Sequence, residues 1–204
     1  MSLLQESEVR ARAAHERSRD TARRQAFSAR PSREILLDSV ASFSEATTYD
    51  IFLSHSIRDA DIVLGVKGLL SDLGYRVYVD WIEDAALDRA NVTPRTAELL
   101  RRRMGSSRTL LYVTTENADN SRWMPWECGY FDGLRGKVAI VPVKTQPTSR
   151  YAGLEYLGLY PYCVRTKDVQ ARERLYVHRA PLHYAVFDEW SSKAPSEVTW
   201  TNHG

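Results

Sequence analysis

Short apolar runs alternate with helical patterns through the middle of the chain, which predicts a parallel sheet with covering helices. Continuous apolar runs of about four to eight residues are typical of buried strands, and apolar positions at helical spacing indicate a helix with one buried face. The predicted strands are 49–54, 75–80, 109–114, 137–143 and part of 156–164. The predicted helices are 59–73, 93–104, 123–133 and a last one within 168–190.

Residues typical of helix ends support two of these helices. Gly74 follows the first helix, where a glycine commonly ends the helical backbone. Ser121 is a candidate N-cap for the 123–133 helix, and Pro125 suits its first turn, where a missing N–H costs little. A strand–helix–strand unit this short implies parallel strands and a right-handed crossover. The alternation favours an α/β fold with a flavodoxin-like, doubly wound parallel sheet.

The chain divides into an extension over 1–45, a main domain over 46–190 and a loose tail over 191–204. Residues 1–34 hold eight Arg against four Glu and one Asp, so 8 − 5 gives +3. This composition predicts an exposed helix or a frayed extension, and a solvated charged face explains it better than contact with a membrane or RNA. The apolar stretch 35–43 is a candidate helix docking on the core.

Composition sets the class of protein more than its chemistry. The 204 residues allow one domain of about 150 residues plus extensions, and 43% hydrophobic with 26% charged residues is typical of a soluble globular protein. A net charge of +2 gives no case for nucleic acid, and no apolar run is long enough to predict a membrane span or signal peptide. Cys128 and Cys163 are too few for a zinc site or a disulfide framework, which predicts a reduced, cytoplasmic protein.

The segment 121–133 contains the most informative chemical group. If its helix begins at Trp123, then Trp123 and Glu127 share a face, and Trp126 precedes the acid directly. A carboxylate beside indoles is either part of a structural anchor, with a buried Trp and a solvated Glu, or a reactive group in an aromatic slot. Residue types alone favour the structural interpretation, since acids near aromatic rings mark sites only some of the time.

Polar residues follow the ends of the first three predicted strands. They are Ser54-His55-Ser56, Asp80-Trp81 and Thr114-Thr115. In doubly wound sheets ligands bind beyond these carboxyl ends, and the helix carrying Glu127 begins shortly after the third strand. The topology therefore brings these loops and Glu127 to one edge. A general-base role for His55 is no better supported than a loop histidine bonded to local backbone.

The run from Tyr49 to about Val143 resembles a Toll/interleukin-1 receptor (TIR) domain in its bacterial form. The matching segments are 49–55, 74–80, 106–113, the Trp123-x-x-x-Glu127 spacing and 136–143. The loop 81–92 lies where the family has its BB loop. Each segment alone is a weak match, but five in the right order over about 95 residues indicate the TIR fold.

The family contains adaptors and enzymes that cleave NAD+ at the nicotinamide–ribose bond, and the Trp-x-x-x-Glu spacing favours the enzymes. The resemblance implies Glu127 as the catalytic acid. The residues it implies for substrate binding are Phe52, Ser54, His55, Ser56, Asp80, Trp81, Trp123 and Trp126. Nicotinamide leaves without protonation, so we expect Glu127 to stabilise the oxocarbenium-like ribose and an indole to stack on nicotinamide, with Trp123 favoured over Trp126.

The chain resembles the signal-producing subunit of Thoeris-type anti-phage defence in its length and its motifs. That resemblance implies NAD+ as substrate with no cofactor or metal, TIR–TIR self-association, a phage component as trigger, and an effector that responds to a linear or cyclic ADP-ribose product. The main alternative is a non-enzymatic interaction module that uses loop 81–92. A nucleotide-processing enzyme on the same fold is a second alternative. Cys128 is expected to be a buried thiol rather than a nucleophile.

Overall fold

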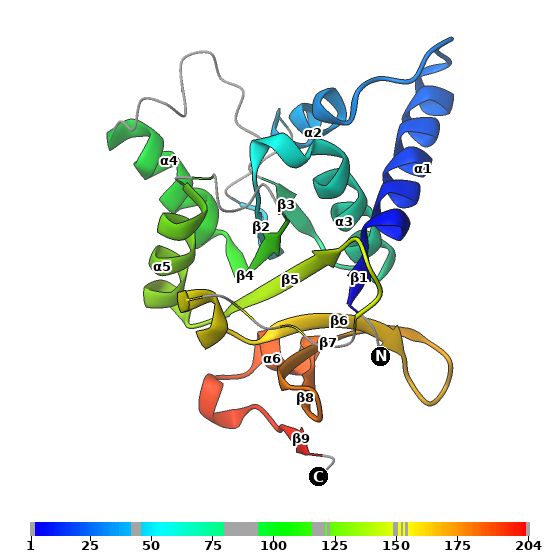
Figure 1. The fold of residues 1–204 in the computed structure, drawn as a ribbon. Coiled ribbons are helices and arrows are strands. Elements are labelled where there is room, and N and C mark those ends of the chain that lie inside the picture. Colours follow the sequence, from blue (N-terminus) through cyan, green and yellow to red (C-terminus); the bar gives the residue numbers. More distant parts are fainter. Residues whose placement is uncertain are drawn as a thin grey trace.

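A central β-sheet with helices on both faces organises the protein, as the computed structural model shows (Figure 1). The structure describes residues 3–41, 46–79, 94–115, 121, 123–148, 151, 153 and 155–202. The strands are β1 (Leu4–Gln5), β2 (Tyr49–Ser54), β3 (Val77–Val79), β4 (Ser107–Thr114), β5 (Val138–Lys144), β6 (Tyr162–Lys167), β7 (Glu173–Ala180), β8 (His183–Val186) and β9 (Thr201–Asn202). The helices are α1 (Glu6–Arg24), α2 (Ser32–Ala41), α3 (Ala60–Asp72), α4 (Pro94–Gly105), α5 (Trp123–Arg135) and α6 (Phe187–Ser192).

Five parallel strands lie in the order β3, β2, β4, β5 and β6. This is the flavodoxin-like order, because the first of these strands in the chain, β2, lies between the second and the third. Ile51 on β2 pairs with Val77 on one side and with Thr109 on the other. The predicted fold class is confirmed, and the point where the chain reverses direction across the sheet lies between β2 and β4.

The two faces of the sheet carry separate hydrophobic clusters, as expected when strand residues alternate between faces. Ile51 and Leu53 pack with residues of α1, α2, α3 and α6, whereas Phe52 packs with residues of α4 and α5. Figure 1 shows α1 and α3 on one side of the sheet, with α4 and α5 on the other. Helix α5 therefore lies on the face to which Phe52 belongs, beside β4 and β2.

The C-terminal region differs from the prediction of a last helix within 168–190, because most of that range forms strands. Strands β7 and β8 form an antiparallel hairpin against β6, and only α6 is helical. Leu175 and Val177 are buried with a period of two, which is the pattern of a strand with one covered face. In the predicted tail, β9 pairs with β8 and Val198 is buried. The domain boundaries themselves stay predictions.

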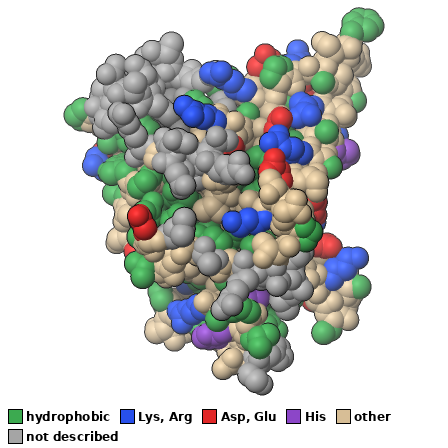
Figure 2. All heavy atoms as spheres, in the orientation of Figure 1, with side chains coloured by type: hydrophobic (Ala, Val, Ile, Leu, Met, Phe, Trp, Pro, Cys, Tyr) green, Lys and Arg blue, Asp and Glu red, His purple; other side chains and the backbone are tan. Residues whose placement is uncertain are grey.

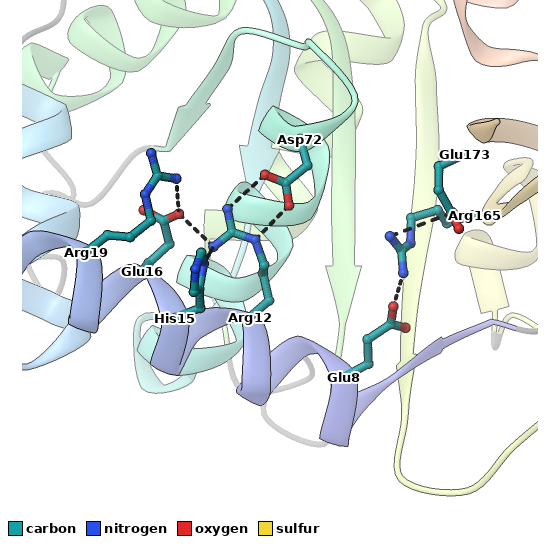
Figure 3. Close-up of polar contacts among 8 residues, drawn as sticks. All are labelled: Glu8, Arg12, His15, Glu16, Arg19, Asp72, Arg165 and Glu173. Atoms are coloured by element: carbon teal, nitrogen blue, oxygen red, sulfur yellow. Dashed lines mark hydrogen bonds and ion pairs between the residues drawn. The ribbon is translucent and has the colours of Figure 1, made fainter.

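Helix α1 packs closely on α3, so it is not the exposed or frayed segment that its composition predicts. Val9 and Ala13 are fully buried. A Cβ added to Gly65 of α3 would lie 2.0 Å from the Val9 carbonyl oxygen, so only glycine allows this approach. Arg12 donates two hydrogen bonds to Asp72, at 2.7 and 2.9 Å (Figure 3). This pair holds the pKa of the Asp72 carboxyl below its usual range.

The segment before α1 belongs to the core of the sheet. Leu4 pairs with Val143 in a parallel register, and the Leu3 amide donates to the Thr148 carbonyl oxygen at 2.9 Å. Leu3 packs in the cluster of α4 and α5, whereas Leu4 packs in that of α1 and α3. Glu8 then contacts Arg165 of β6 (Figure 3). None of the helices that the structure describes combines the length and apolar character needed to cross a membrane.

Candidate functional site

Helix α5 presents its acid on a buried face. The Ser121 hydroxyl accepts a hydrogen bond from the Met124 amide at 3.3 Å, which caps the helix start as predicted. Trp123 and Glu127 lie one turn apart and are both buried, with exposed fractions of 6% and 2%. The spacing therefore places them on one face. The structural alternative needs a solvated Glu127, and that part of it is wrong.

Glu127 is joined to the end of β2 by a short hydrogen bond. The Ser54 hydroxyl donates to Glu127 Oε2 at 2.6 Å, and Ser54 is 1% exposed. A bond of this length to a carboxylate is typical of a charge-assisted interaction. It connects β2 with α5 at the carboxyl edge of the sheet, beside the β2–β4 switch point. The edge that the topology predicts is thus the edge where the acid lies.

The two indoles next to the acid have different surroundings. Trp123 packs in the cluster of Phe52 and Tyr112, and its ring meets Trp126 edge-on at 5.5 Å. Trp126 is half-buried and stacks on Tyr130 at 5.6 Å, with the Arg101 guanidinium 5.7 Å from its ring centroid. Trp126 is thus part of an aromatic stack on α5. Which indole contacts a bound ring stays a prediction.

The other predicted residues after β2 are buried and bonded locally. His55 Nδ1 lies 2.8 Å from the Leu53 carbonyl oxygen, which indicates a proton on Nδ1. The Ser56 hydroxyl accepts from the Arg58 amide at 3.4 Å. Phe52, on β2 itself, is fully buried. These contacts favour the local-backbone interpretation of His55, and direct contact of these three residues with a ligand stays a prediction.

A second bond across the same edge involves Asp59, which sequence reasoning missed. The Thr115 hydroxyl, just after β4, donates to Asp59 Oδ2 at 2.6 Å. Asp59 is 7% exposed and directly precedes α3, so its position as an acid before a helix was the available signal. The bond holds the loops after β2 and β4 together. Asp80, Trp81 and the loop 81–92 lie outside the described residues, so their predicted roles are neither supported nor contradicted.

A cavity of about 560 Å³ lies beside the loop after β2, but its lining includes neither Glu127 nor Ser54. Arg10 and Arg17 from α1 line it, and both pair with Asp61, at 3.6 and 2.8 Å. Figure 2 shows charges of both signs side by side on the part of the surface that α1 forms. Arg10 and Arg17 are therefore paired within the protein, and this cavity is separate from the Ser54–Glu127 edge.

The cysteines provide a test of the buried interior. Cys128 is fully buried, and burial raises the pKa of its thiol to about 11. Burial also raises the pKa of Cys163. At pH 8 both thiols should stay protonated, so we expect no labelling by a disulfide reagent in the folded protein. Two thiols should react once guanidinium unfolds the chain, and rapid labelling of Cys128 before unfolding would contradict its predicted structural role.

The sheet order, together with a buried acid on the helix after β4, agrees with the TIR fold that the sequence resembles. No family model matches the chain. It is 46% identical over 160 residues to the "Probable 3' cyclic ADP-D-ribose synthase ThsB'" of Bacillus cereus (strain MSX-D12), covering 78% of this chain and 83% of that protein. It is 31% identical over 83 residues to the "Putative cyclic ADP-D-ribose synthase TIR2" of Cytobacillus dafuensis, covering 40% of this chain and 22% of that protein. The chain belongs to the Thoeris-type TIR family that ThsB' represents.

Proposed function

We propose that the protein cleaves NAD+ at the nicotinamide–ribose bond and closes the remaining ADP-ribose into a cyclic signal for anti-phage defence. The observation that carries the proposal is Glu127, buried at the carboxyl edge of the sheet and held by Ser54. The names of both relatives, which describe cyclic ADP-D-ribose synthases, support the substrate and the product class. NAD+ acts here as the substrate, and the reaction as written needs no separate cofactor.

The reaction divides into two bond changes. The bond between the ribose anomeric carbon and the nicotinamide nitrogen breaks, and its electron pair leaves with neutral nicotinamide. A hydroxyl of the same molecule then attacks the anomeric carbon, and its proton passes to Glu127 and on to solvent. The Glu127 carboxylate stabilises the oxocarbenium-like centre in between. Attack by water in place of that hydroxyl would give linear ADP-ribose.

Product mass separates these outcomes. Purified protein is incubated with NAD+, with and without lysate from phage-infected cells, and the products are separated and weighed by mass spectrometry. We expect nicotinamide and a product lighter than ADP-ribose by one water. Linear ADP-ribose alone would contradict the cyclase assignment while leaving NAD+ cleavage in place. An absence of NAD+ loss in both conditions would favour the interaction module instead.

Assembly and signalling complete the proposal. The cyclic product activates a separate effector protein, as the Thoeris-type family implies, and a phage component triggers the enzyme. Copies of the chain associate through their TIR domains, and a loop of a neighbouring copy completes the site. Size-exclusion chromatography with light scattering, run with and without infected lysate, measures the assembly directly.

Ser54→Ala tests the positioning of the acid. Hydrogen bonds to charged groups contribute about 1.5–3 kcal/mol, so loss of this one should lower kcat/KM for NAD+ by roughly tenfold to a hundredfold. Ser54→Thr retains a hydroxyl and should recover part of that loss. Ser106→Ala is the matched control, because the Ser106 hydroxyl bonds only the local Arg102 carbonyl oxygen at 3.2 Å among the contacts described. Equal turnover of Ser54→Ala and wild type would show that Ser54 does not position Glu127.

A further inference from the structure

A second cavity, of about 460 Å³, lies at the other end of the sheet from Glu127. It is enclosed by the start of β5, the loop before β6, α6 and the C-terminal segment, which lie in the lower part of the view in Figure 1. Lys137 and Arg179 line it together with Tyr160, Trp190 and Trp200, and we call it the Lys137 cavity. Nothing in the reaction proposed above uses these residues.

Lys137 is a buried cation with donors to spare. Lys137 is 6% exposed, and its Nζ donates a hydrogen bond to the Trp190 carbonyl oxygen at 2.5 Å. Nζ also lies 5.2 Å from the centroid of the Trp190 ring. An ammonium group carries three donors, and the described residues supply one hydrogen-bond acceptor. Burial lowers the pKa of Lys137, because enclosing an ammonium group away from water without a carboxylate beside it disfavours its charged form.

Arg179 adds a second cation to the same cavity. Its guanidinium carbon lies 4.0 Å from the centroid of the Trp200 ring, and the residue is exposed. Among the described residues, no carboxylate forms an ion pair with either Lys137 or Arg179. Asp132 lines the cavity, but its Oδ2 accepts the Tyr160 hydroxyl at 3.2 Å. The cavity therefore holds two cations that lack acidic partners in this part of the chain.

We propose that the Lys137 cavity binds a small anion attached to a flat ring, such as a nucleoside monophosphate or an aromatic carboxylate. The anion would accept from the remaining Lys137 donors and from the Arg179 guanidinium, which suits both phosphate and carboxylate. Tyr160, Pro161 and Trp200 supply an aromatic and apolar wall for the ring. The volume lies in the range of about 300–1,000 Å³ that is typical of small-molecule sites.

Four probe compounds test separately whether the cavity recognises the ring, the anion or both. Adenosine monophosphate and indole-3-acetate each combine a ring with an anion, whereas adenosine carries the ring alone and inorganic phosphate the anion alone. Binding is measured by calorimetry on full-length Glu127→Gln protein, which prevents turnover. We expect one of the two ring anions to bind at one site per chain, at least tenfold more tightly than adenosine or phosphate. The better of the two tells phosphate from carboxylate.

Two substitutions locate the site. Arg179→Gln and Lys137→Met should each weaken binding of the better ring anion at least tenfold, while Arg23→Gln, at an exposed position of α1, should not. Arg179 lies on the surface, so Arg179→Gln should leave NAD+ turnover and the melting temperature unchanged. This variant therefore tests the proposed site even if Lys137→Met does not fold. Equal affinity in wild type and Arg179→Gln overturns the proposal, as does the absence of ring-anion binding at millimolar concentration. Binding of adenosine or of phosphate as tight as that of the better ring anion overturns it too.

Discussion

Glu127→Gln should slow NAD+ consumption by about 10²–10³-fold while the protein keeps its fold. The substitution retains the size of the side chain and an oxygen that can accept from the Ser54 hydroxyl, which now lies 2.6 Å from Oε2. It removes the negative charge that, in the proposed reaction, stabilises the ribose cation. Loss of one such electrostatic group lowers kcat by about 10²–10³. The measurement is nicotinamide release over time, with the melting temperature recorded for the same samples.

Glu98→Gln is the matched control for Glu127→Gln. Glu98 lies on α4 with an exposed side chain and forms a 3.6 Å ion pair with Arg101. Glu98→Gln removes the same charge at a position away from the sheet edge, so NAD+ turnover by this variant should equal that of wild type. If Glu127→Gln retained full turnover at an unchanged melting temperature, Glu127 would not be the catalytic acid. A large drop in melting temperature for Glu127→Gln alone would mark it as structural.

Gly65→Ala should destabilise the protein, although alanine is the better helix former. The new Cβ would lie 2.0 Å from the Val9 carbonyl oxygen, which is far inside contact distance, so α1 must move away from α3. Overpacking of this kind costs about 1–3 kcal/mol and occasionally more. For a chain of this size the melting temperature should fall by roughly 2–12 °C. Thermal unfolding followed by circular dichroism measures the change.

The position of α1 gives a second readout for Gly65→Ala. Helix α1 is rich in arginine, so limited trypsin digestion should cut it faster when it no longer packs on α3. Gly129→Ala on α5 is the control, because an added Cβ there meets nothing within 4 Å. That variant should gain about 0.5–1 kcal/mol of stability. A melting temperature for Gly65→Ala at or above that of wild type would contradict the close α1–α3 contact.

Local patterns predict the parallel part of the fold well, because the first three buried strands are short apolar runs, each with a helical pattern after it. Topology then brings Ser54 and the helix of Glu127 to one edge. The hydrogen bond between them depends on strand register and side-chain rotamers, which no local pattern contains. The same holds for α1, whose docking depends on Gly65 of another helix. The β7–β8 hairpin was not predicted, although Leu175 and Val177 are apolar residues two positions apart, as in a strand with one covered face.

The Ser54–Glu127 hydrogen bond can form only after the ribosome has synthesised both residues. The two residues are separated by 73 positions, and β4 must enter the sheet between them in chain order. At about 5–20 residues per second, the ribosome takes several seconds to add the acid after the serine. A nascent chain or a proteolytic fragment that ends before α5 contains the serine without the acid. If Glu127 is the catalytic acid, as proposed above, such partial chains cannot cleave NAD+ in the cell that makes them.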